Sequence, residues 1–206
     1  MTEAEARVWI RARFGVSRET AVAQFLDFLI TESADQNLIS ASSIGEIWRR
    51  HVVDSAQLLG LAPADRSALN WADIGTGAGF PGMVLAILSD HRFSLIEPRR
   101  RRAEFLQRSS GALGITHRVR VKHARAETID DQVDVISARA VAALPELLKT
   151  GRAISTEKTL WLLPKGPNAR EEVAAARRTW HGSFHVEPSI TQPDSLIVVA
   201  TGVKPR

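Results

Sequence analysis

Cysteine is absent from this chain of 206 residues. Its absence excludes disulfide bonds, thiolate nucleophiles, zinc sites built on cysteine and cysteine-bound iron–sulfur clusters. Long apolar runs are missing too, since no segment approaches the ~20 apolar residues of a membrane-spanning helix. The opening stretch MTEAEARVWIRARFG has no apolar run of the signal-peptide type, and its acidic residues argue against a transit peptide. We therefore expect a cytoplasmic, monomeric enzyme that uses neither a membrane nor a metal.

Basic residues are only slightly in excess, with 27 lysines and arginines against 23 acidic residues and a formal net charge of +4. Their distribution is more informative than their number. Four arginines are consecutive, at Arg99, Arg100, Arg101 and Arg102. A second basic group follows at Arg118, Arg120, Lys122, His123 and Arg125. Most basic residues on such a chain are simply solvated, but clusters of this kind are typical of proteins that bind a polyanion such as RNA.

The first third of the chain has the apolar spacing of helices. The predicted helices cover residues 5–14, 19–34 and 44–60. Capping residues are expected at Thr2 with Glu5, at Ser17, and at Ser43 with Glu46. We predict that residues 1–65 form a helical extension, which packs on a core formed by residues 66–206 in a single compact unit.

From residue 70 onward, short apolar runs alternate with helical segments. The predicted strands cover residues 70–75, 92–98, 117–127, 132–140, 158–166, 183–190 and 195–203. The predicted helices among them cover residues 82–90, 99–114, 141–150 and 168–180. Strands alternating with helices form a parallel sheet, whereas the last two strands, with no helix between them, form an antiparallel pair at one edge. The predicted fold class is α/β, with a Rossmann-like, mostly parallel sheet of seven strands.

The segment WADIGTGAGFPG carries four glycines after the first predicted strand. Gly77, Gly79 and Gly82 satisfy the G-x-G-x-x-G pattern of dinucleotide-binding sites, and Glu97 follows about 20 residues later. A nicotinamide or flavin enzyme is therefore one interpretation. Two features argue against it, because the strand ends too early for that pattern and the nearby carboxylate of Asp73 would repel a pyrophosphate.

Beginning at Asp73, the same segment reads D-x-G-x-G-x-G, which resembles the first motif of Rossmann-like class I methyltransferases that bind S-adenosylmethionine. This ligand has no phosphate, and a carboxylate at the mouth of the loop would attract its ammonium and sulfonium. Gly75, Gly77 and Gly79 let the backbone pass close to the ligand, since a Cβ would block the approach. Glu97 ends the second strand, where its carboxylate can accept both ribose hydroxyls.

The loop after the third predicted strand contains Ala126 and Glu127. In a methyltransferase of this fold that loop lies against the adenine, so a backbone amide and an acidic side chain there can bind the adenine edge. Taken alone, the pair is equally consistent with a solvated loop acid.

The range of possible methyl acceptors is narrowed by a motif that is absent after the fourth predicted strand and by the lack of cysteine. Methyltransferases that act on exocyclic amines have an N/D-P-P-Y/F/W motif there, whereas this chain reads DVISARAVA. Methylation of a pyrimidine carbon commonly needs a cysteine nucleophile, and radical methylation needs a cysteine-bound cluster. What remains is an oxygen or amine with a base supplied elsewhere, or an atom with its own lone pair such as guanine N7. For N7, positioning can supply up to about 7–11 kcal/mol without a general base.

Seven segments occur in an order that resembles one family of RNA methyltransferases. They are NLIS (37–40), WRRHVVDS (48–55), DIGTGAGFPG (73–82), SLIEPRRRRAEFL (94–106), RAE (125–127), SARAVA (137–142) and LLPKG (162–166). Together they closely resemble the small-subunit ribosomal RNA methyltransferase G family, also called glucose-inhibited division protein B. The resemblance implies transfer of a methyl group from S-adenosylmethionine to N7 of a guanine in 16S rRNA of the small ribosomal subunit, guanine 527 in the family, with S-adenosylhomocysteine as the product.

The resemblance also implies roles for individual residues. Family cofactor contacts fall on Gly75, Phe80, Ala126, Glu127 and Arg139. Arg139 and His51 are expected to position the guanine. RNA contacts are expected at Arg99 to Arg102, at Lys165, around Arg118 and on the N-terminal helices.

Each of these side chains also has a purely structural interpretation. Phe80 can anchor the turn in the core, Arg139 can form a surface salt bridge, and Lys165 can be solvated. His51 can be a buried histidine fixed by Asp54. Three other functions stay open at this point: a dinucleotide-dependent oxidoreductase, a methyltransferase for a small molecule, and a non-catalytic RNA-binding or assembly protein.

Overall fold

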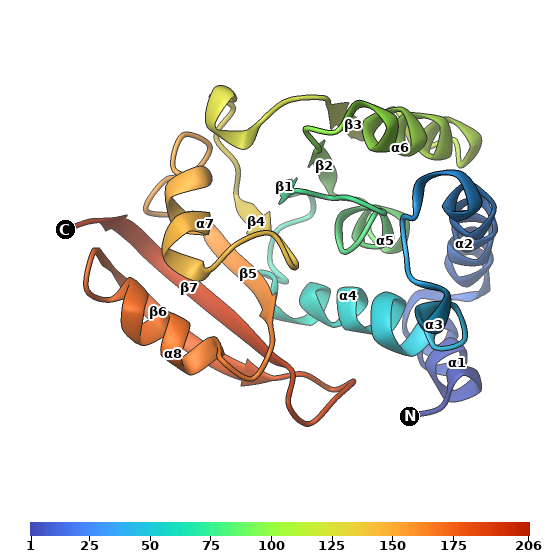
Figure 1. Cartoon of the computed structure of the whole chain (residues 1–206), viewed down its shortest axis with the longest axis horizontal. Helices are drawn as coiled ribbons and strands as arrows, with labels where there is room; N and C mark the ends of the chain where they lie inside the picture. The colour runs from blue at the N-terminus through green and yellow to red at the C-terminus, as the bar shows by residue number, and fades with distance from the viewer.

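The centre of the molecule is a seven-stranded sheet with the strand order β3-β2-β1-β4-β5-β7-β6, seen in a computed structural model that describes residues 1–206 (Figure 1). The strands are β1 (Asn70–Ile74), β2 (Arg92–Ile96), β3 (Val119–Lys122), β4 (Val135–Ser137), β5 (Leu160–Lys165), β6 (Trp180–Pro188) and β7 (Leu196–Pro205). β1 to β5 run parallel, while β7 lies antiparallel between β5 and β6. The predicted fold class, with its antiparallel pair at one edge, is confirmed.

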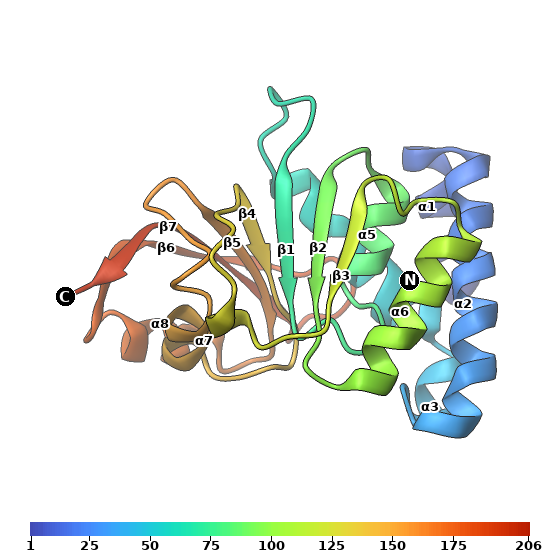
Figure 2. The ribbon, with the colours of Figure 1, turned by 90° about the horizontal axis from the view of Figure 1, so that it is seen from above.

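Helices cover both faces of this sheet. The longer ones are α1 (Glu3–Phe14), α2 (Val16–Gln36), α5 (Gly82–Leu88), α6 (Arg100–Ala112), α7 (Leu144–Thr150) and α8 (Ala169–Ala176). Figure 2 shows α1, α2, α5 and α6 gathered beside β1, β2 and β3, while α7 and α8 lie near β4 to β7. No helix combines the length and the apolar character that a membrane crossing requires.

Alternate strand residues feed two separate hydrophobic clusters, as the period of two along a strand requires. Trp71 and Phe93 belong to the larger cluster, which is shared with α1, α2, α5 and α6. Ala72 and Ile74 face the opposite way, into the cluster under α7 and α8. In the larger cluster the Phe25 ring of α2 lies 6.0 Å from that of Phe80, so the N-terminal helices pack on the sheet. The division of the chain at residue 65 stays a prediction.

Local capping signals were a mixed guide to the N-terminal helices. The capping box of Thr2 and Glu5 forms as predicted at the start of α1. Ser17 was wrong as a cap, because α2 begins at Val16 directly after Gly15, whose φ of 88° ends the preceding helix. The predicted box of Ser43 and Glu46 is also absent, since Ser43 pairs with Ser40 and Glu46 pairs with Arg49.

The segment predicted as one helix over 44–60 is in fact broken into several pieces. They are α3 (Ala41–Ile44), a π-helical turn (Trp48–Val53), α4 (Asp54–Ala56) and a 3-10 helix (Gln57–Leu61). The π-helical turn starts where the carboxylate of Glu3 accepts hydrogen bonds from the amides of Trp48 and Arg49, both at 2.9 Å. A tertiary contact from α1 therefore replaces the local cap. π-Helical turns are frequent at functional sites.

The strand order reverses between β1 and β4, which are neighbours although β2 and β3 lie between them in sequence. In open α/β sheets, ligands bind outside the carboxyl ends of the strands at such a reversal. The glycine loop after β1 and the segment after β4 both leave the sheet at this point. The fold therefore directs attention to the residues of these two segments.

Candidate functional site

The glycine loop follows β1 and is fastened to the end of β2. Gly75 and Gly77 have φ values of 67° and 59°, in the left-handed region that glycine enters at little cost. The amide of Gly75 donates to the carbonyl of Ile96 at 2.8 Å. The amide of Gly77 donates to a carboxylate oxygen of Glu97 at 2.9 Å. Gly75 and Gly77 thus present their backbone at the carboxyl ends of β1 and β2 without side chains of their own.

The position of Asp73 corrects the sequence interpretation. Its carboxylate is fully buried beneath the loop, and not at its mouth. One oxygen accepts from the Ser137 hydroxyl at 2.6 Å, and the other accepts from the Gly82 amide at 3.0 Å. Burial raises the pKa of Asp73 to about 6, although these hydrogen bonds favour the ionised form. Asp73 therefore braces β4 and the start of α5 and does not face a ligand.

Two glycines of the G-x-G-x-x-G pattern are required by packing. A Cβ on Gly79 would stand 2.4 Å from the Phe25 ring, and its φ of 103° also favours glycine. A Cβ on Gly82 would stand 2.6 Å from both Asp73 and Leu95. The side of Gly79 on which a Cβ would stand therefore faces α2, and contact of its backbone with the cofactor stays a prediction. The dinucleotide pattern arises here from helix and strand packing.

Glu97 and the segment after β3 are placed as predicted, at the carboxyl ends of β2 and β3. Glu97 is buried and accepts from the amides of Gly77 and Arg99. Each carboxylate oxygen has two acceptor positions, so a second donor can approach each of them. Ala126 and Glu127 begin a short 3-10 helix (Ala126–Thr128), and their amides make no hydrogen bond within the protein. These groups can still bind a ligand.

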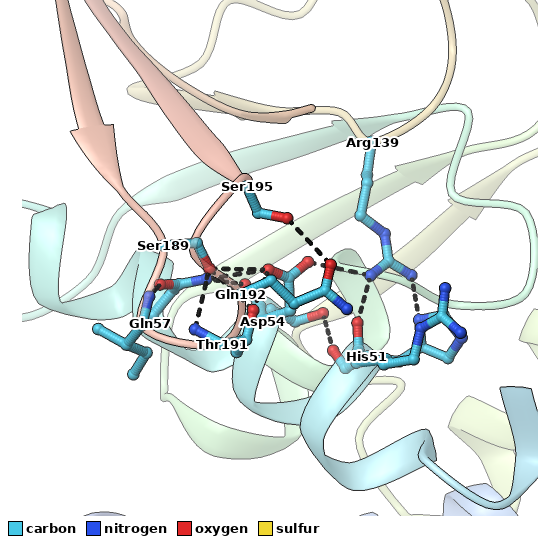
Figure 3. A network of polar contacts seen from close by, with 11 residues as sticks. His51, Asp54, Gln57, Arg139, Ser189, Thr191, Gln192 and Ser195 are labelled. Atoms are coloured by element: carbon cyan, nitrogen blue, oxygen red, sulfur yellow. Dashed lines mark hydrogen bonds and ion pairs between the residues drawn. The ribbon is translucent and has the colours of Figure 1, made fainter. Parts of the chain in front are cut away.

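Arg139, His51 and Phe80 converge although they come from three different segments, and Figure 3 shows the contact of Arg139 with His51. The Arg139 guanidinium lies over the Phe80 ring, 5.2 Å from its centroid. It also donates to Nδ1 of His51 at 3.0 Å. The imidazole stacks on the same phenylalanine, with ring centroids 4.8 Å apart. The sequence predicted these three residues as site residues, and the structure brings them together.

The contacts of His51 define its protonation. Burial, reinforced by the charges of Arg139 and Arg50, lowers the pKa of His51 from 6.5 to about 4. The imidazole is therefore neutral near pH 7. Because a guanidinium can only donate, Nδ1 must be the acceptor, and the proton of the neutral ring sits on Nε2. His51 thus offers one N–H donor and no positive charge.

Asp54 holds Arg139, where the sequence had paired it with His51. One Asp54 oxygen lies 3.1 Å from the Arg139 guanidinium, which also donates to the carbonyl of Arg50. The other oxygen accepts from Gln57 at 3.0 Å and from the hydroxyls of Ser189 and Thr191 at 3.4 and 3.2 Å (Figure 3). These hydroxyls lie in the turn between β6 and β7. Sequence reasoning missed both, because no local pattern links residues this far apart.

A cleft of about 560 Å³ opens beside Arg139, between the segment 139–143, the end of β5 and the start of β7. The glycine loop does not line this cleft. Val141 packs on the loop instead, and its Cγ2 lies 2.7 Å from where a Cβ on Gly75 would stand. Any larger residue in place of this glycine would therefore displace the segment after β4.

Lys165 corrects another prediction. Its ammonium donates to the carbonyl of Ala142 at 2.6 Å and lies 2.9 Å from the carboxylate of Glu172. The side chain is only 9% exposed. Glu172 also accepts from the amide of Leu144. Lys165 is thus a tie for the segment after β4. The alternative of a solvated lysine is wrong, and contact of Lys165 with RNA stays a prediction.

The predicted RNA-binding arginines divide between two ends of the sheet. Arg99 to Arg102 follow β2 and begin α6, at the carboxyl end. Arg100 pairs with Glu104, and Arg102 lies beside the glycine loop. Arg118 directly precedes β3, which runs parallel to β2, so it lies at the amino end. Arg118 therefore lies apart from Arg99, whereas His123 of the same basic group follows β3 at the carboxyl end and lies 3.2 Å from the carbonyl of Pro98.

The sequence of this chain matches both a family model and full-length relatives. The sequence model of the family described as rRNA small subunit methyltransferase G matches residues 18–193. The ribosomal RNA small subunit methyltransferase G of Zymomonas mobilis is 43% identical, and the match covers 100% of this chain and 96% of that protein.

Solved structures with low sequence identity share the fold. A SAM dependent methyltransferase from Aquifex aeolicus superposes with a TM-score of 0.60 at 17% identity, covering 82% of this chain and 97% of that chain. A variant of MtNAS in complex with S-adenosylmethionine has a TM-score of 0.60 at 18% identity, covering 90% of this chain and 76% of that chain. From the family match and the full-length relative together, the chain belongs to the rRNA small subunit methyltransferase G family.

Proposed function

We propose that this protein transfers a methyl group from S-adenosylmethionine to N7 of a guanine in 16S rRNA, acting in the cytoplasm as a monomer. One observation carries the proposal in a chain of this family. The glycine loop, Glu97 and the free amides after β3 all lie at the carboxyl ends of neighbouring strands, beside the pair of Arg139 and His51.

The groups at these strand ends fit S-adenosylmethionine. The backbone at Gly75 and Gly77 would accommodate its amino acid end, because neither residue has a side chain, and Val141 would move off Gly75 as the ligand enters. Glu97 would accept the ribose hydroxyls with its remaining lone pairs, and the amides of Ala126 and Glu127 would donate to the adenine edge. When bound, the cofactor supplies an electrophilic methyl group on a positively charged sulfur.

The residues next to the proposed methyl acceptor would orient the guanine for transfer. Guanine N7 has a lone pair and no proton to lose, so no general base is needed. Arg139, held over Phe80, and the Nε2–H of neutral His51 are hydrogen-bond donors that can orient the guanine in the cleft. Holding the reacting atoms in line is worth several kcal/mol, since effective molarities of well-oriented groups are large. Arg99 to Arg102 would meet the RNA backbone beside this site.

The test is to map N7-methylguanine in small-subunit RNA from cells with and without the gene for this protein. We expect one modified guanine to disappear, to return with the intact chain, and to stay absent with Arg139→Ala. Arg152→Ala, a change of an exposed arginine on another part of the surface, is the matched control and should restore the modification.

Binding measurements separate this proposal from the oxidoreductase interpretation. The purified protein should bind S-adenosylmethionine and S-adenosylhomocysteine in calorimetric titration, with Glu97→Gln weakening both. A preference for a nicotinamide dinucleotide, or an unchanged modification pattern in the deletion strain, would contradict the proposed function.

A further inference from the structure

The face of the sheet at β2 and β3 that points away from α5 and α6 is not covered by a helix. The crossover from β3 to β4 contains only the 3-10 helix Ala126–Thr128, a segment of three residues. No residue of β3 belongs to the hydrophobic cluster on that face of the sheet. An edge strand with an uncovered face is available to a partner.

Basic side chains occupy this open face because of the strand period. Phe93 and Val119 point into the larger core cluster, so their neighbours along the strands point the other way. These neighbours are Arg92 and Ser94 on β2, with Arg120 on β3, and Ser94 is directly paired with Arg120. Lys122 continues the same face of β3.

These residues line a groove of about 360 Å³ at the amino end of the sheet. We call it the β3 groove and define it by Asn70, Arg92, Ser94, Arg118, Arg120 and Asp131. β2 has five residues and spans about 16 Å, so the groove is separated from the cofactor end by roughly this length of strand.

The positive charge of the β3 groove has little compensation within the protein. Arg92 and Arg120 are exposed and form no salt bridge. Arg118 reaches back to α5 instead, where its guanidinium donates to the carbonyl of Ala86. The one carboxylate of the groove, Asp131, is engaged by Lys122. The guanidinium groups of Arg92 and Arg120 thus share one concave site without a salt bridge of their own, a charge pattern that favours a polyanion.

We propose that the β3 groove binds phosphate groups of the RNA backbone, as a second contact of the substrate on the end of the sheet opposite the site of methyl transfer. This inference rests on the proposed function. Lys122 and His123 lead from the groove along β3 toward Arg99, which follows the neighbouring strand. The substrate is therefore RNA long enough to pass around the β3 edge, and a short oligonucleotide with only the target loop cannot reach both ends.

The test compares two RNAs with the intact protein: a long fragment of small-subunit RNA and a short oligonucleotide that contains only the target loop. The variant is the double substitution Arg92→Glu with Arg120→Glu. The matched control is Arg152→Glu with Arg178→Glu, which makes the same change of net charge at exposed arginines elsewhere. Binding is measured over a range of salt concentrations, together with KM and kcat for methylation of the long RNA.

We expect the double substitution to weaken binding of the long RNA by about tenfold to hundredfold at low salt. It should also reduce the slope of log K against log salt by about two, one for each lost phosphate contact. Short RNA and S-adenosylmethionine should bind as before, and KM for the long RNA should rise with little change in kcat. The control variant should behave like the wild type.

Several outcomes would overturn the proposal. One of them is that the double variant and the control bind long RNA with the same affinity and the same salt dependence. Another is a loss of binding affinity that is equal for short and long RNA. This result must be repeated with the milder Arg92→Gln and Arg120→Gln pair, in a protein whose melting temperature is unchanged. Binding of polyglutamate as tightly as RNA would assign the groove to an acidic protein partner. If the wild type binds long RNA through the groove but methylates no guanine, the proposed function fails and the groove assignment stands.

Discussion

Arg139 at the carboxyl end of the sheet and Arg92 and Arg120 at its amino end carry the same guanidinium group in opposite surroundings. The Arg139 side chain is 19% exposed and is held by Asp54, His51, Phe80 and a backbone carbonyl. Arg92 and Arg120 are exposed and have no carboxylate partner. A held guanidinium has a fixed direction and can orient a small target, whereas a free one supplies charge that salt screens.

The difference lies in where the partners come from. The side chains that contact Arg139 come from the π-helical turn, the glycine loop and α4. Asp54 is itself held by hydrogen bonds from the turn between β6 and β7. Several segments must therefore be folded before Arg139 has its direction. The two exposed arginines of the β3 groove, by contrast, stand on two neighbouring strands and need no partner side chain to supply their charge. A guanidinium with a fixed direction therefore requires several packed segments, whereas an exposed guanidinium supplies positive charge without them.

The largest effect is expected from Arg139→Ala. Truncating one partner of a largely buried, hydrogen-bonded charge pair costs about 2–5 kcal/mol, so methyl transfer should fall by about two to three orders of magnitude. Single-turnover methylation with saturating cofactor measures this loss, and Arg120→Ala is the comparison. If Arg120→Ala reduces the single-turnover rate as much as Arg139→Ala does, the contrast between the two ends breaks down.

The next effect is a pH dependence of stability that comes from His51. Its pKa of about 4 in the folded protein is below the ordinary value of 6.5, so the unfolded chain binds more protons between these values. The contribution of neutral His51 to the free energy of unfolding is therefore fully present above pH ~6.5 and is lost as pH falls toward 4, by at most about 3 kcal/mol.

Asp73 titrates in the same range with the opposite sign, because burial raises its pKa from 3.8 to about 6. The measurement is therefore the difference in unfolding free energy between wild type and His51→Gln across this pH range. His181→Gln, at an exposed histidine, is the control. A difference that does not vary with pH would show that His51 is not held neutral by its surroundings.

A smaller effect is expected from Asp54→Asn, which keeps the shape of the side chain and removes its charge. The direction of Arg139 then depends on weaker neutral contacts, and methylation should fall about 30-fold, equivalent to about 2 kcal/mol. The nitrogen-15 NMR signals of His51 provide a second measurement, because Nδ1 should lose its hydrogen bond from Arg139. Asp194→Asn, an exposed change in the hairpin turn, should leave both unchanged.

The smallest effect is expected from Arg92→Ala on folding. An exposed arginine without an ion pair contributes little, so the free energy of unfolding should change by no more than about 0.5 kcal/mol. Chemical denaturation measures it directly. A loss well above 1 kcal/mol would mean that Arg92 is held by the fold in the way that Arg139 is.

The sequence was a good guide wherever neighbouring residues carry the signal. The seven strands, the final antiparallel pair and the capping box of Thr2 and Glu5 all depend on local patterns, and the structure contains them. The family resemblance identified His51 and Arg139 as site residues, but their direct contact was not predicted. It did not follow from spacing, because the two residues are 88 positions apart.

Errors arose where a distant partner decides the outcome. Asp73 was expected to face a ligand, but Ser137, 64 residues away, takes up one of its oxygens beneath the loop. The Cβ side of Gly79 was expected to face the cofactor, but the Phe25 ring lies against it. Lys165 was expected to contact RNA, with a solvated side chain as the alternative, but its ammonium pairs with Glu172. Each residue type was compatible with the motif, and only the packed neighbours reveal which way it points.

Glu3 connects the first helix to the turn that positions His51. Its two carboxylate oxygens anchor the amides of Trp48 and Arg49, at the start of the turn that carries His51. A truncation or an affinity tag that unwinds the beginning of this helix would therefore let the imidazole drift. Enzymologists comparing preparations of this protein should treat the design of that terminus as a variable of the assay.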